Sequence, residues 1–299
     1  MTGSAPPFAK LWFVCNPSSG SNDDAVVDEL LAAFTRIGLA PDRVVRFPDD
    51  PAPSPQELDA AGVDLLAVFA GDGTTHSVVT GAYGWGGGVL VLPGGTMNLL
   101  AKRLHGDFPA LDIIPRLASG APLSRVRPKV VRGRLGDGLT GALIGPGAVW
   151  NDVREAMRAA SIVEFFTTAR EAISYSANGP RVLCADADCG REEGYVAISV
   201  VPHEDGLEAN GFYAESLGDY AGQGIALLSR NFRNGPHDEL GRHSSLRLVS
   251  STGAPMGMLM DGESRDGEAE ERFELATCEV DLILTRPEET IGDGTTDAR

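Results

Sequence analysis

A short apolar run that leads directly into a glycine-rich turn occurs twice in close succession, and this repeat constrains the possible folds most. Leu65 to Phe69 runs into Ala70-Gly71-Asp72-Gly73-Thr74, and Val89 to Leu92 runs into Pro93-Gly94-Gly95-Thr96. Helical spacing of apolar residues follows each turn. Strands that alternate with helices predict a parallel sheet with crossover helices, and such a sheet binds ligands in the turns at the carboxyl ends of its strands.

Two further pairs of strand and helix precede these units, so residues 1–122 form one α/β pattern. In the second pair, Ser54 is expected to cap a helix that Pro55 begins, with Glu57 completing a capping box. The expected strands are 11–15, 44–47, 65–69 and 89–92, and the expected helices are 23–37, 55–61, 75–83 and 97–104.

The pattern changes after residue 122 to short β-like runs, which predict a mainly antiparallel second domain over residues 123–287. The chain length also favours two domains, and the first is the α/β domain over residues 1–122. Residues 288–299 are polar and contain glycine, so we expect a disordered tail. The β-like runs are 126–135, 181–184, 195–201, 245–249, 256–260, 272–277 and 279–284; helical spacing is present at 152–160 and 167–176 and is less regular at 225–230.

The formal net charge of −17 argues against nucleic acid as a partner, because phosphate backbones need a basic surface that replaces their counterions. No apolar stretch is long enough to span a bilayer, and the N-terminus lacks the basic and apolar segments of a secretion signal, so we expect a soluble cytoplasmic protein. Cys15, Cys184, Cys189 and Cys278 have no Cys-x-x-Cys spacing and no histidines at zinc-ligand offsets, so buried free thiols are expected.

The turn around Asp72 is the segment most informative about chemistry. Glycines let backbone N–H groups approach an anion closely, and the following helix N-terminus adds favourable partial charge, so phosphate is the expected ligand. A carboxylate in such a loop would repel phosphate unless Mg²⁺ or a substrate hydroxyl lies between them. Asp72 therefore points to phosphoryl transfer. On these residues alone, an ordinary tight turn with an aspartate that caps the helix is an equal alternative.

Three other segments carry polar groups that could join this turn. Asn16-Pro17-Ser18-Ser19-Gly20 follows the first strand, and Pro93-Gly94-Gly95-Thr96-Met97-Asn98 follows the fourth. Asp261-Gly262-Glu263 ends a later β-like run and presents two carboxylates about a glycine. Each taken alone, the first and last of these segments are better explained as ordinary turns with solvated polar residues.

These four segments, in this order and on these elements, resemble the catalytic domain of the diacylglycerol kinase and sphingosine kinase superfamily, and the resemblance covers nearly the whole chain. It implies an N-terminal α/β domain with a parallel sheet, similar to those of phosphofructokinases and NAD kinases, followed by a mainly antiparallel β-sandwich. It also implies ATP and Mg²⁺ as cofactors. The residues that it implies for nucleotide binding are Asn16, Ser19, Gly20, Ala70, Gly71, Asp72, Gly73, Thr74, Thr75, His76, Gly94, Gly95, Thr96, Asn98 and Lys102.

The resemblance also implies roles for acidic residues. The acceptor hydroxyl would be deprotonated by Asp72, Asp261 or Glu263, and the sequence does not choose among them. A structural Mg²⁺ would be held at the Asp-Gly-Leu segment that begins at Asp205, through Asp205 and Leu207.

Several positions depart from the family pattern. Ala70 stands where glycine is usual, Ser77 where a glutamate is common, and Ser21-Asn22 where a basic pair is often found. Phe47-Pro48-Asp49-Asp50 lacks the threonine or histidine expected after the second strand. These departures keep open a catalytically silent protein that binds lipid or nucleotide. An NAD kinase is a further alternative, although such enzymes usually carry a later Asn-Glu pair that this sequence lacks.

The leading interpretation is an ATP-dependent lipid kinase. It would transfer the γ-phosphoryl group to a hydroxyl of a diacylglycerol, a sphingoid base or a related lipid presented at a membrane surface. Phe165, Phe166, Phe212 and Tyr213 could line an apolar acceptor pocket, although such aromatic residues more often belong to a core. A homodimer and transient membrane association stay open.

Overall fold

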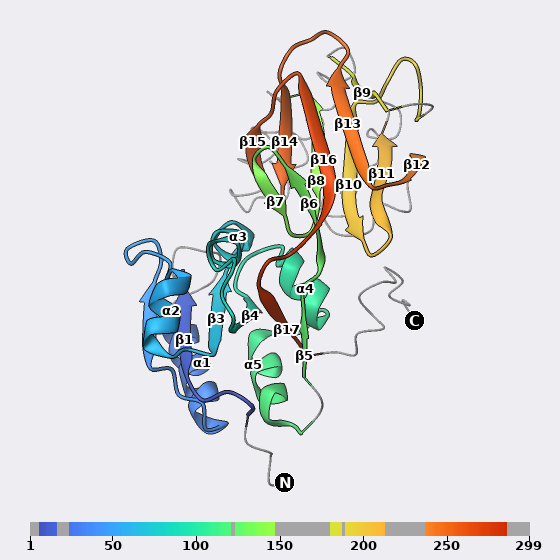
Figure 1. The fold of residues 1–299 in the computed structure, drawn as a ribbon. Coiled ribbons are helices and arrows are strands. Elements are labelled where there is room, and N and C mark those ends of the chain that lie inside the picture. Colours follow the sequence, from blue (N-terminus) through green and yellow to red (C-terminus); the bar gives the residue numbers. More distant parts are fainter. Residues whose placement is uncertain are drawn as a thin grey trace. The chain divides into compact units, whose positions relative to one another are not determined.

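The computed structural model describes residues 6–16, 24–120, 123–146, 180–186, 189–212 and 237–285 (Figure 1). The chain divides into two compact units, Met1–Pro128 with Thr277–Arg299, and Lys129–Ala276. The helices expected at 152–160, 167–176 and 225–230 and the tail at 288–299 lie outside the described residues.

The first unit contains a mostly parallel six-stranded sheet in the order β2-β1-β3-β4-β17-β5. Only the edge strand β5 runs antiparallel to its neighbour. The first four strands begin and end within a single residue of their expected positions, so the predicted parallel α/β domain is confirmed. The strands are β1 (Leu11–Cys15), β2 (Arg43–Arg46), β3 (Leu65–Ala70), β4 (Gly88–Pro93), β5 (Ser124–Val126) and β17 (Asp281–Leu284).

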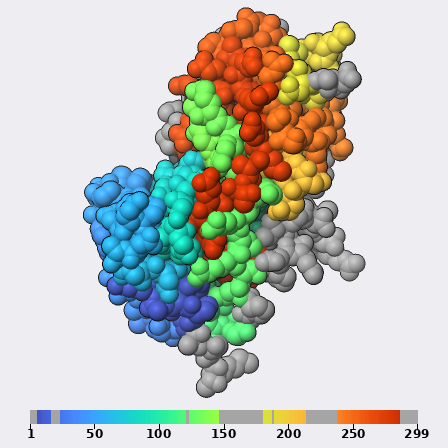
Figure 2. Space-filling model, in the orientation of Figure 1, coloured from blue at the N-terminus to red at the C-terminus, as the bar shows by residue number. Residues whose placement is uncertain are grey.

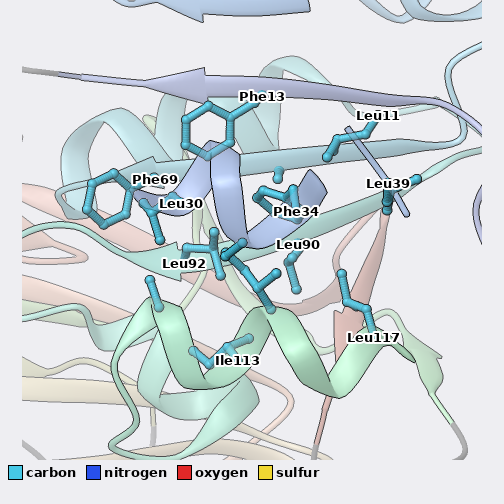
Figure 3. Packing of buried hydrophobic residues seen from close by; sticks show 14 of the residues in the cluster. Leu11, Phe13, Leu30, Phe34, Leu39, Phe69, Leu90, Leu92, Ile113 and Leu117 are labelled. Atoms are coloured by element: carbon cyan, nitrogen blue, oxygen red, sulfur yellow. The ribbon is translucent and has the colours of Figure 1, made fainter. Parts of the chain in front are cut away.

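One face of this sheet is covered by α1 (Asp24–Arg36), α5 (Ala110–Ile113) and the 3-10 helix η1 (Ile114–Ala118). A cluster of buried apolar side chains fills the layer between them, as Figure 3 shows. Phe34 of α1 meets Phe13 of β1 edge-on, with 5.9 Å between the ring centroids. This layer fixes the sheet against α1 and holds the carboxyl ends of its strands in register.

The opposite face of the sheet is covered as well, because the alternate residues Val14 and Val68 are also buried. On the strands β3 and β4 lie α3 (Asp72–Gly81) and α4 (Leu99–His105). A sheet buried on both faces explains why its strands are continuously apolar in the sequence. Both of these helices start directly after the glycine turns.

The helix α2 (Pro55–Ala61) begins as the sequence predicts. The Ser54 hydroxyl accepts a hydrogen bond from the Glu57 N–H, and the Glu57 carboxylate accepts one from the Ser54 N–H at 2.8 Å. These bonds hold the pKa of Glu57 below its usual range. The capping box therefore forms entirely from local sequence.

Strand β17 was expected in the second domain, but it belongs to the first. Its residues pair in parallel with β4 and antiparallel with β5, and Leu282 and Ile283 are fully buried. Figure 2 shows atoms of this returning segment, drawn in red, beside green atoms of the β5 region. The chain returns because the open edge of β4 offers unpaired backbone groups and an apolar surface for Leu282 and Ile283.

The second unit is built from two antiparallel sheets, which confirms the mainly antiparallel prediction. Its buried cluster draws side chains from both sheets, so the core lies between them as in a sandwich. The six-stranded sheet has the order β12 (Asp238–His243), β11 (Gly206–Phe212), β10 (Ala197–His203), β8 (Ala142–Pro146), β14 (Met256–Met260), β15 (Glu263–Asp266). The five-stranded sheet has the order β7 (Gly136–Gly138), β6 (Lys129–Gly133), β16 (Glu270–Thr277), β13 (Ser245–Ser250), β9 (Val182–Cys184).

Strand β11 was missed in the sequence because its glycines and polar residues weaken the β signal. Its Gly211 is required by packing, since a Cβ there would lie 2.5 Å from the Tyr195 ring. The Tyr195 hydroxyl donates to Asp238 at 2.9 Å and accepts from the Arg191 N–H at 3.1 Å. Burial, and then the bond to Asp238, raises the pKa of Tyr195 to about 12. A buried tyrosine with satisfied polar groups therefore anchors this strand.

The four cysteines are free thiols in the structure. Cys15 and Cys278 are buried, as expected, whereas Cys184 and Cys189 are only half-buried. Burial and a hydrogen bond with Cys184 raise the pKa of Cys189 to about 12.

Candidate functional site

The two glycine-rich turns touch each other at the carboxyl edge of the parallel sheet. Strands β3 and β4 are neighbours in register, so the turns that follow them start side by side. The Gly94 N–H donates to the Ala70 carbonyl at 3.2 Å. A Cβ on Gly95 would lie only 2.5 Å from the Gly71 Cα. Glycine at position 95 is therefore what allows the two backbones to meet.

Asp72 locks the two turns together. It is the first residue of α3, and its carboxylate accepts the Asn98 N–H at 2.9 Å on one oxygen and the Leu99 N–H at 2.7 Å on the other. These N–H groups lie at the start of α4, where helix donors have no intrahelical partner and the helix favours negative charge. Asp72 therefore caps the neighbouring helix α4.

Asn98 shapes the second turn from within. Its backbone is left-handed, with φ 54° and ψ 43°, a conformation that asparagine tolerates better than most residues. Its side-chain oxygen accepts the Gly95 N–H at 2.7 Å, and its side-chain amide donates to the Gly95 carbonyl at 2.8 Å. This pair of bonds holds the turn in one conformation.

Asn16 brings the end of β1 to the same edge. Its side-chain amide donates to the Thr74 hydroxyl at 2.8 Å, and its N–H donates to the Phe69 carbonyl at 3.3 Å. The connection from β1 leads to β2 on one side, whereas the connection from its neighbour β3 leads to β4 on the other side, so the two connections run in opposite directions. Such a switch point is where open α/β sheets bind their ligands. Asn16 and Thr74 meet at this point.

Helix α3 begins three residues before the sequence predicted, at Asp72 instead of Thr75. The Thr75 N–H donates to the Gly71 carbonyl at 3.0 Å, which makes Gly73 and Thr74 part of the first helical turn. The glycine signal concealed this start because glycine disfavours helix interiors but is tolerated in the first turn. The predicted loop is therefore a helix N-terminus with Gly71 as its cap.

The remaining predicted nucleotide residues have varied surroundings. Ala70 and Thr75 are buried, His76 is half-buried, and Thr96 is exposed. Lys102 lies in the last turn of α4, where its ammonium is 3.6 Å from the Asp107 carboxylate. Ser19 and Gly20 lie outside the described residues.

Arg46 is a cation that the sequence reading missed. It ends β2 and pairs in register with Cys15, so it stands at the same edge of the sheet as Asn16. Its guanidinium is 2.7 Å from Asp24, the first residue of α1. Arg46 lies near the end of the expected strand 44–47, and this position is the sequence feature that could have placed it at the carboxyl edge of the sheet.

Asp261 and Glu263 lie in the second unit, at the turn between β14 and β15. Asp261 is only 5% exposed, and it accepts the Leu139 N–H at 2.8 Å on one oxygen. Its other oxygen accepts the Thr140 N–H and hydroxyl, both at 2.7 Å, and a longer bond from the Gly141 N–H at 3.4 Å. Asp261 therefore anchors residues 139–141. Glu263 is half-buried in β15, opposite Met260.

The arrangement around Asp205 does not fit a bound Mg²⁺. Both of its carboxylate oxygens contact the Arg242 guanidinium, at 2.5 and 2.7 Å, and this bond holds the pKa of Asp205 below its usual range. The Leu207 side chain is fully buried in the core. Within the described ranges, no group of three or more His, Cys, Asp and Glu side chains is placed to hold a metal ion.

Residues 10–122 match the family of the diacylglycerol kinase catalytic domain. This part of the chain is similar to a lipid-kinase catalytic domain. The match spans the parallel sheet as far as β4, both glycine turns and Asn16, so the family resemblance seen in the sequence is confirmed. No functionally curated protein matches the sequence.

Solved structures share the fold of this chain over most of its length. A "putative diacylglycerol kinase" from Bacillus anthracis str. Sterne superposes with a TM-score of 0.64 and 17% identity, covering 93% of this chain and 95% of that one. A further crystal structure from the same organism, named as a diacylglycerol kinase, superposes with a TM-score of 0.60 and 17% identity. The superposition covers 93% of this chain and 98% of that one. At such identities the likeness shows the fold alone.

Replacing Gly95 by alanine is expected to separate the two glycine-rich turns. The added Cβ meets the Gly71 backbone, which cannot rotate away, so we expect the free energy of unfolding to fall by about 1–3 kcal/mol. Gly81→Ala is the matched control, because a Cβ there meets nothing within 4 Å. Thermal unfolding of both variants checks this, and equal stability of the two would contradict the contact.

Proposed function

We propose that the protein is an ATP-dependent lipid kinase that transfers the γ-phosphoryl group of ATP to a lipid hydroxyl. The observation that carries the proposal is the double hydrogen bond from Asp72 to Asn98 and Leu99. It joins the N-termini of α3 and α4 and the glycine backbones before them into one rigid anion-binding surface at the switch point of the sheet. The family match supports a kinase at this surface.

Each part of this surface has a task in phosphoryl transfer. The backbone N–H groups around Gly71 and Gly95 approach the phosphates closely because neither residue has a side chain. Lys102 and Arg46 are the cations that could neutralise further phosphate charge. Asn16 and Thr74 would position the nucleotide from the β1 side. Such a site accelerates the reaction mainly by positioning and charge neutralisation.

Asp72 is the carboxylate that fits a catalytic Mg²⁺ at these turns. Its two oxygens accept the Asn98 and Leu99 N–H groups, and a carboxylate is among the oxygen ligands that Mg²⁺ prefers. Bound Mg²⁺ would neutralise charge on the transferring phosphoryl group. The bonds from α4 hold the Asp72 carboxylate in one orientation, so its position needs no adjustment when nucleotide binds.

The acceptor hydroxyl needs a base, and the three candidates differ in their surroundings. Asp72 is held by two N–H groups, whereas Asp261 is buried beneath four donors. Glu263 is half-buried and begins β15. Protonation of Asp261 would weaken the bonds that it accepts from residues 139–141, so anchoring and catalysis make separate predictions for this residue.

The acceptor is proposed to be a diacylglycerol, a sphingoid base or a related amphiphile. Phe212 is fully buried and its ring lies 5.8 Å from that of His237, so it belongs to the core rather than to an open pocket. Phe165, Phe166 and Tyr213 lie outside the described residues. None of the helices in the described part of the chain has the length and apolarity to cross a membrane.

The proposal is tested by incubating the full chain with γ-labelled ATP, MgCl₂ and mixed micelles of diacylglycerol or sphingosine. We expect label in the organic phase, with Gly95→Ala much reduced and Gly81→Ala unchanged. Label that appears in NAD instead would support an NAD kinase. Nucleotide binding without transfer to any lipid would support the catalytically silent alternative.

A further inference from the structure

The turn between β10 and β11 carries two carboxylates that share one arginine. Arg242 of β12 contacts both oxygens of Asp205, at 2.5 and 2.7 Å, and its second nitrogen lies 3.3 Å from Glu208. Glu208 pairs in register with Arg242 across the two strands. The guanidinium therefore lies between Asp205 and Glu208.

We propose that Arg242 serves as the built-in cation of this turn, so that the second unit needs no divalent metal there. The guanidinium holds the carboxylates that would otherwise attract a cation. This inference is independent of the proposed kinase activity.

Gly206 lets the arginine reach this position. A Cβ on Gly206 would lie 3.1 Å from the Arg242 Cβ and 3.3 Å from the His243 N–H nitrogen, so any larger residue would push β12 away from the turn. The close approach brings the base of the Arg242 side chain over the turn. Packing against β12 therefore explains the glycine of the Asp-Gly-Leu segment without a metal ion.

Charge and geometry both favour the guanidinium over a metal. A divalent cation binds carboxylate oxygens at about 2.0–2.6 Å, so between Asp205 and Glu208 it would have to take the place that the Arg242 guanidinium occupies. Arginine stays protonated at any physiological pH, and its planar fork can contact two carboxylates at once. His203 approaches Glu208 from β10, with 3.3 Å between Nε2 and the carboxylate. The Asn210 amide donates to the other Glu208 oxygen at 3.4 Å.

Removing the guanidinium should make stability depend on divalent cations. Arg242→Gln leaves Asp205 and Glu208 close together without their shared positive charge. We expect its apparent Tm in EDTA to be about 1–3 °C below that of the unchanged protein, since both partners are partly exposed. Millimolar MgCl₂ should recover part of this loss, because Mg²⁺ can replace the missing charge.

The experiment is thermal unfolding of the full chain without nucleotide, in EDTA and in MgCl₂, for four proteins. The unchanged protein should have the same Tm in both buffers. The Tm of Arg242→Gln should be higher in MgCl₂ than in EDTA. The Tm of Asp205→Asn/Arg242→Gln should rise less, because one of the two carboxylates is gone. Arg191→Gln is the matched control, since Arg191 pairs with the single carboxylate of Asp238 at similar exposure.

Two outcomes would overturn the proposal. A fall in the Tm of the unchanged protein in EDTA would show that a metal stabilises it despite Arg242. An equal response of Arg242→Gln and Arg191→Gln to MgCl₂ would show that the carboxylate pair does not attract a cation. Because no nucleotide or lipid is present, failure of the kinase proposal would leave these results unchanged.

Discussion

Replacing Asp72 by asparagine is expected to lower kcat/KM for phosphoryl transfer by at least about 10²-fold. The substitution removes the carboxylate that would face Mg²⁺. It also turns one of the two oxygens into an N–H donor that faces the N–H of Asn98 or Leu99. We expect the free energy of unfolding to fall by about 1–3 kcal/mol, because a donor of α4 loses its acceptor. Steady-state kinetics and denaturant unfolding of the same preparation measure the two effects.

Ser54→Ala is the control that separates stability from catalysis. Ser54 caps α2 through bonds to Glu57, and its loss should cost about 1 kcal/mol. Because α2 contributes no residue to the glycine turns, we expect unchanged kcat/KM at a temperature where both variants are folded. Wild-type turnover in Asp72→Asn would sink the assignment of Asp72 to the site. An equal loss of activity in Ser54→Ala would mean that stability alone explains the effect.

Local sequence was sufficient for the elements that carry the site. The strands β1 to β4 are short apolar runs between helical patterns, and the α2 cap needs only residues 54–57. The turns could be placed at the carboxyl edge because all parallel strands end there. These elements could be predicted because they depend on hydrophobic periodicity and turn residues, which are properties of neighbouring residues.

The contacts that organise the site could not be derived in the same way. Asp72 bonds to Asn98 and Leu99 across 26 and 27 positions, and nothing in the local sequence names its partners. The same reason explains β17, which returns to β4 from the end of the chain, and Arg242, which reaches Asp205 across 37 positions. Long-range contacts depend on the completed fold. The sequence therefore predicted that the glycine turns lie at one edge of the sheet, whereas the contacts that explain their residue types became clear only in the structure.

Replacing Asp261 by asparagine is expected to produce the largest loss of stability in the second unit. Asp261 accepts bonds from Leu139, Thr140 and Gly141, and the amide of asparagine would set an N–H group against one of these donors. We expect the free energy of unfolding to fall by about 2–4 kcal/mol, because buried N–H groups lose a charged acceptor. Denaturant unfolding followed by a probe in the second unit measures it.

Glu263→Gln distinguishes anchoring from base catalysis at this turn. Glu263 belongs to the same turn and is only half-buried, so its neutral variant should unfold close to the unchanged protein. If Asp261 only anchors residues 139–141, Asp261→Asn should lose stability and keep measurable kcat at low temperature. If it is the base, kcat should fall by about 10²-fold or more at temperatures where the variant is fully folded. If Asp261→Asn is stable but inactive, the anchoring role of Asp261 is contradicted. If Glu263→Gln is inactive, Glu263 is the base.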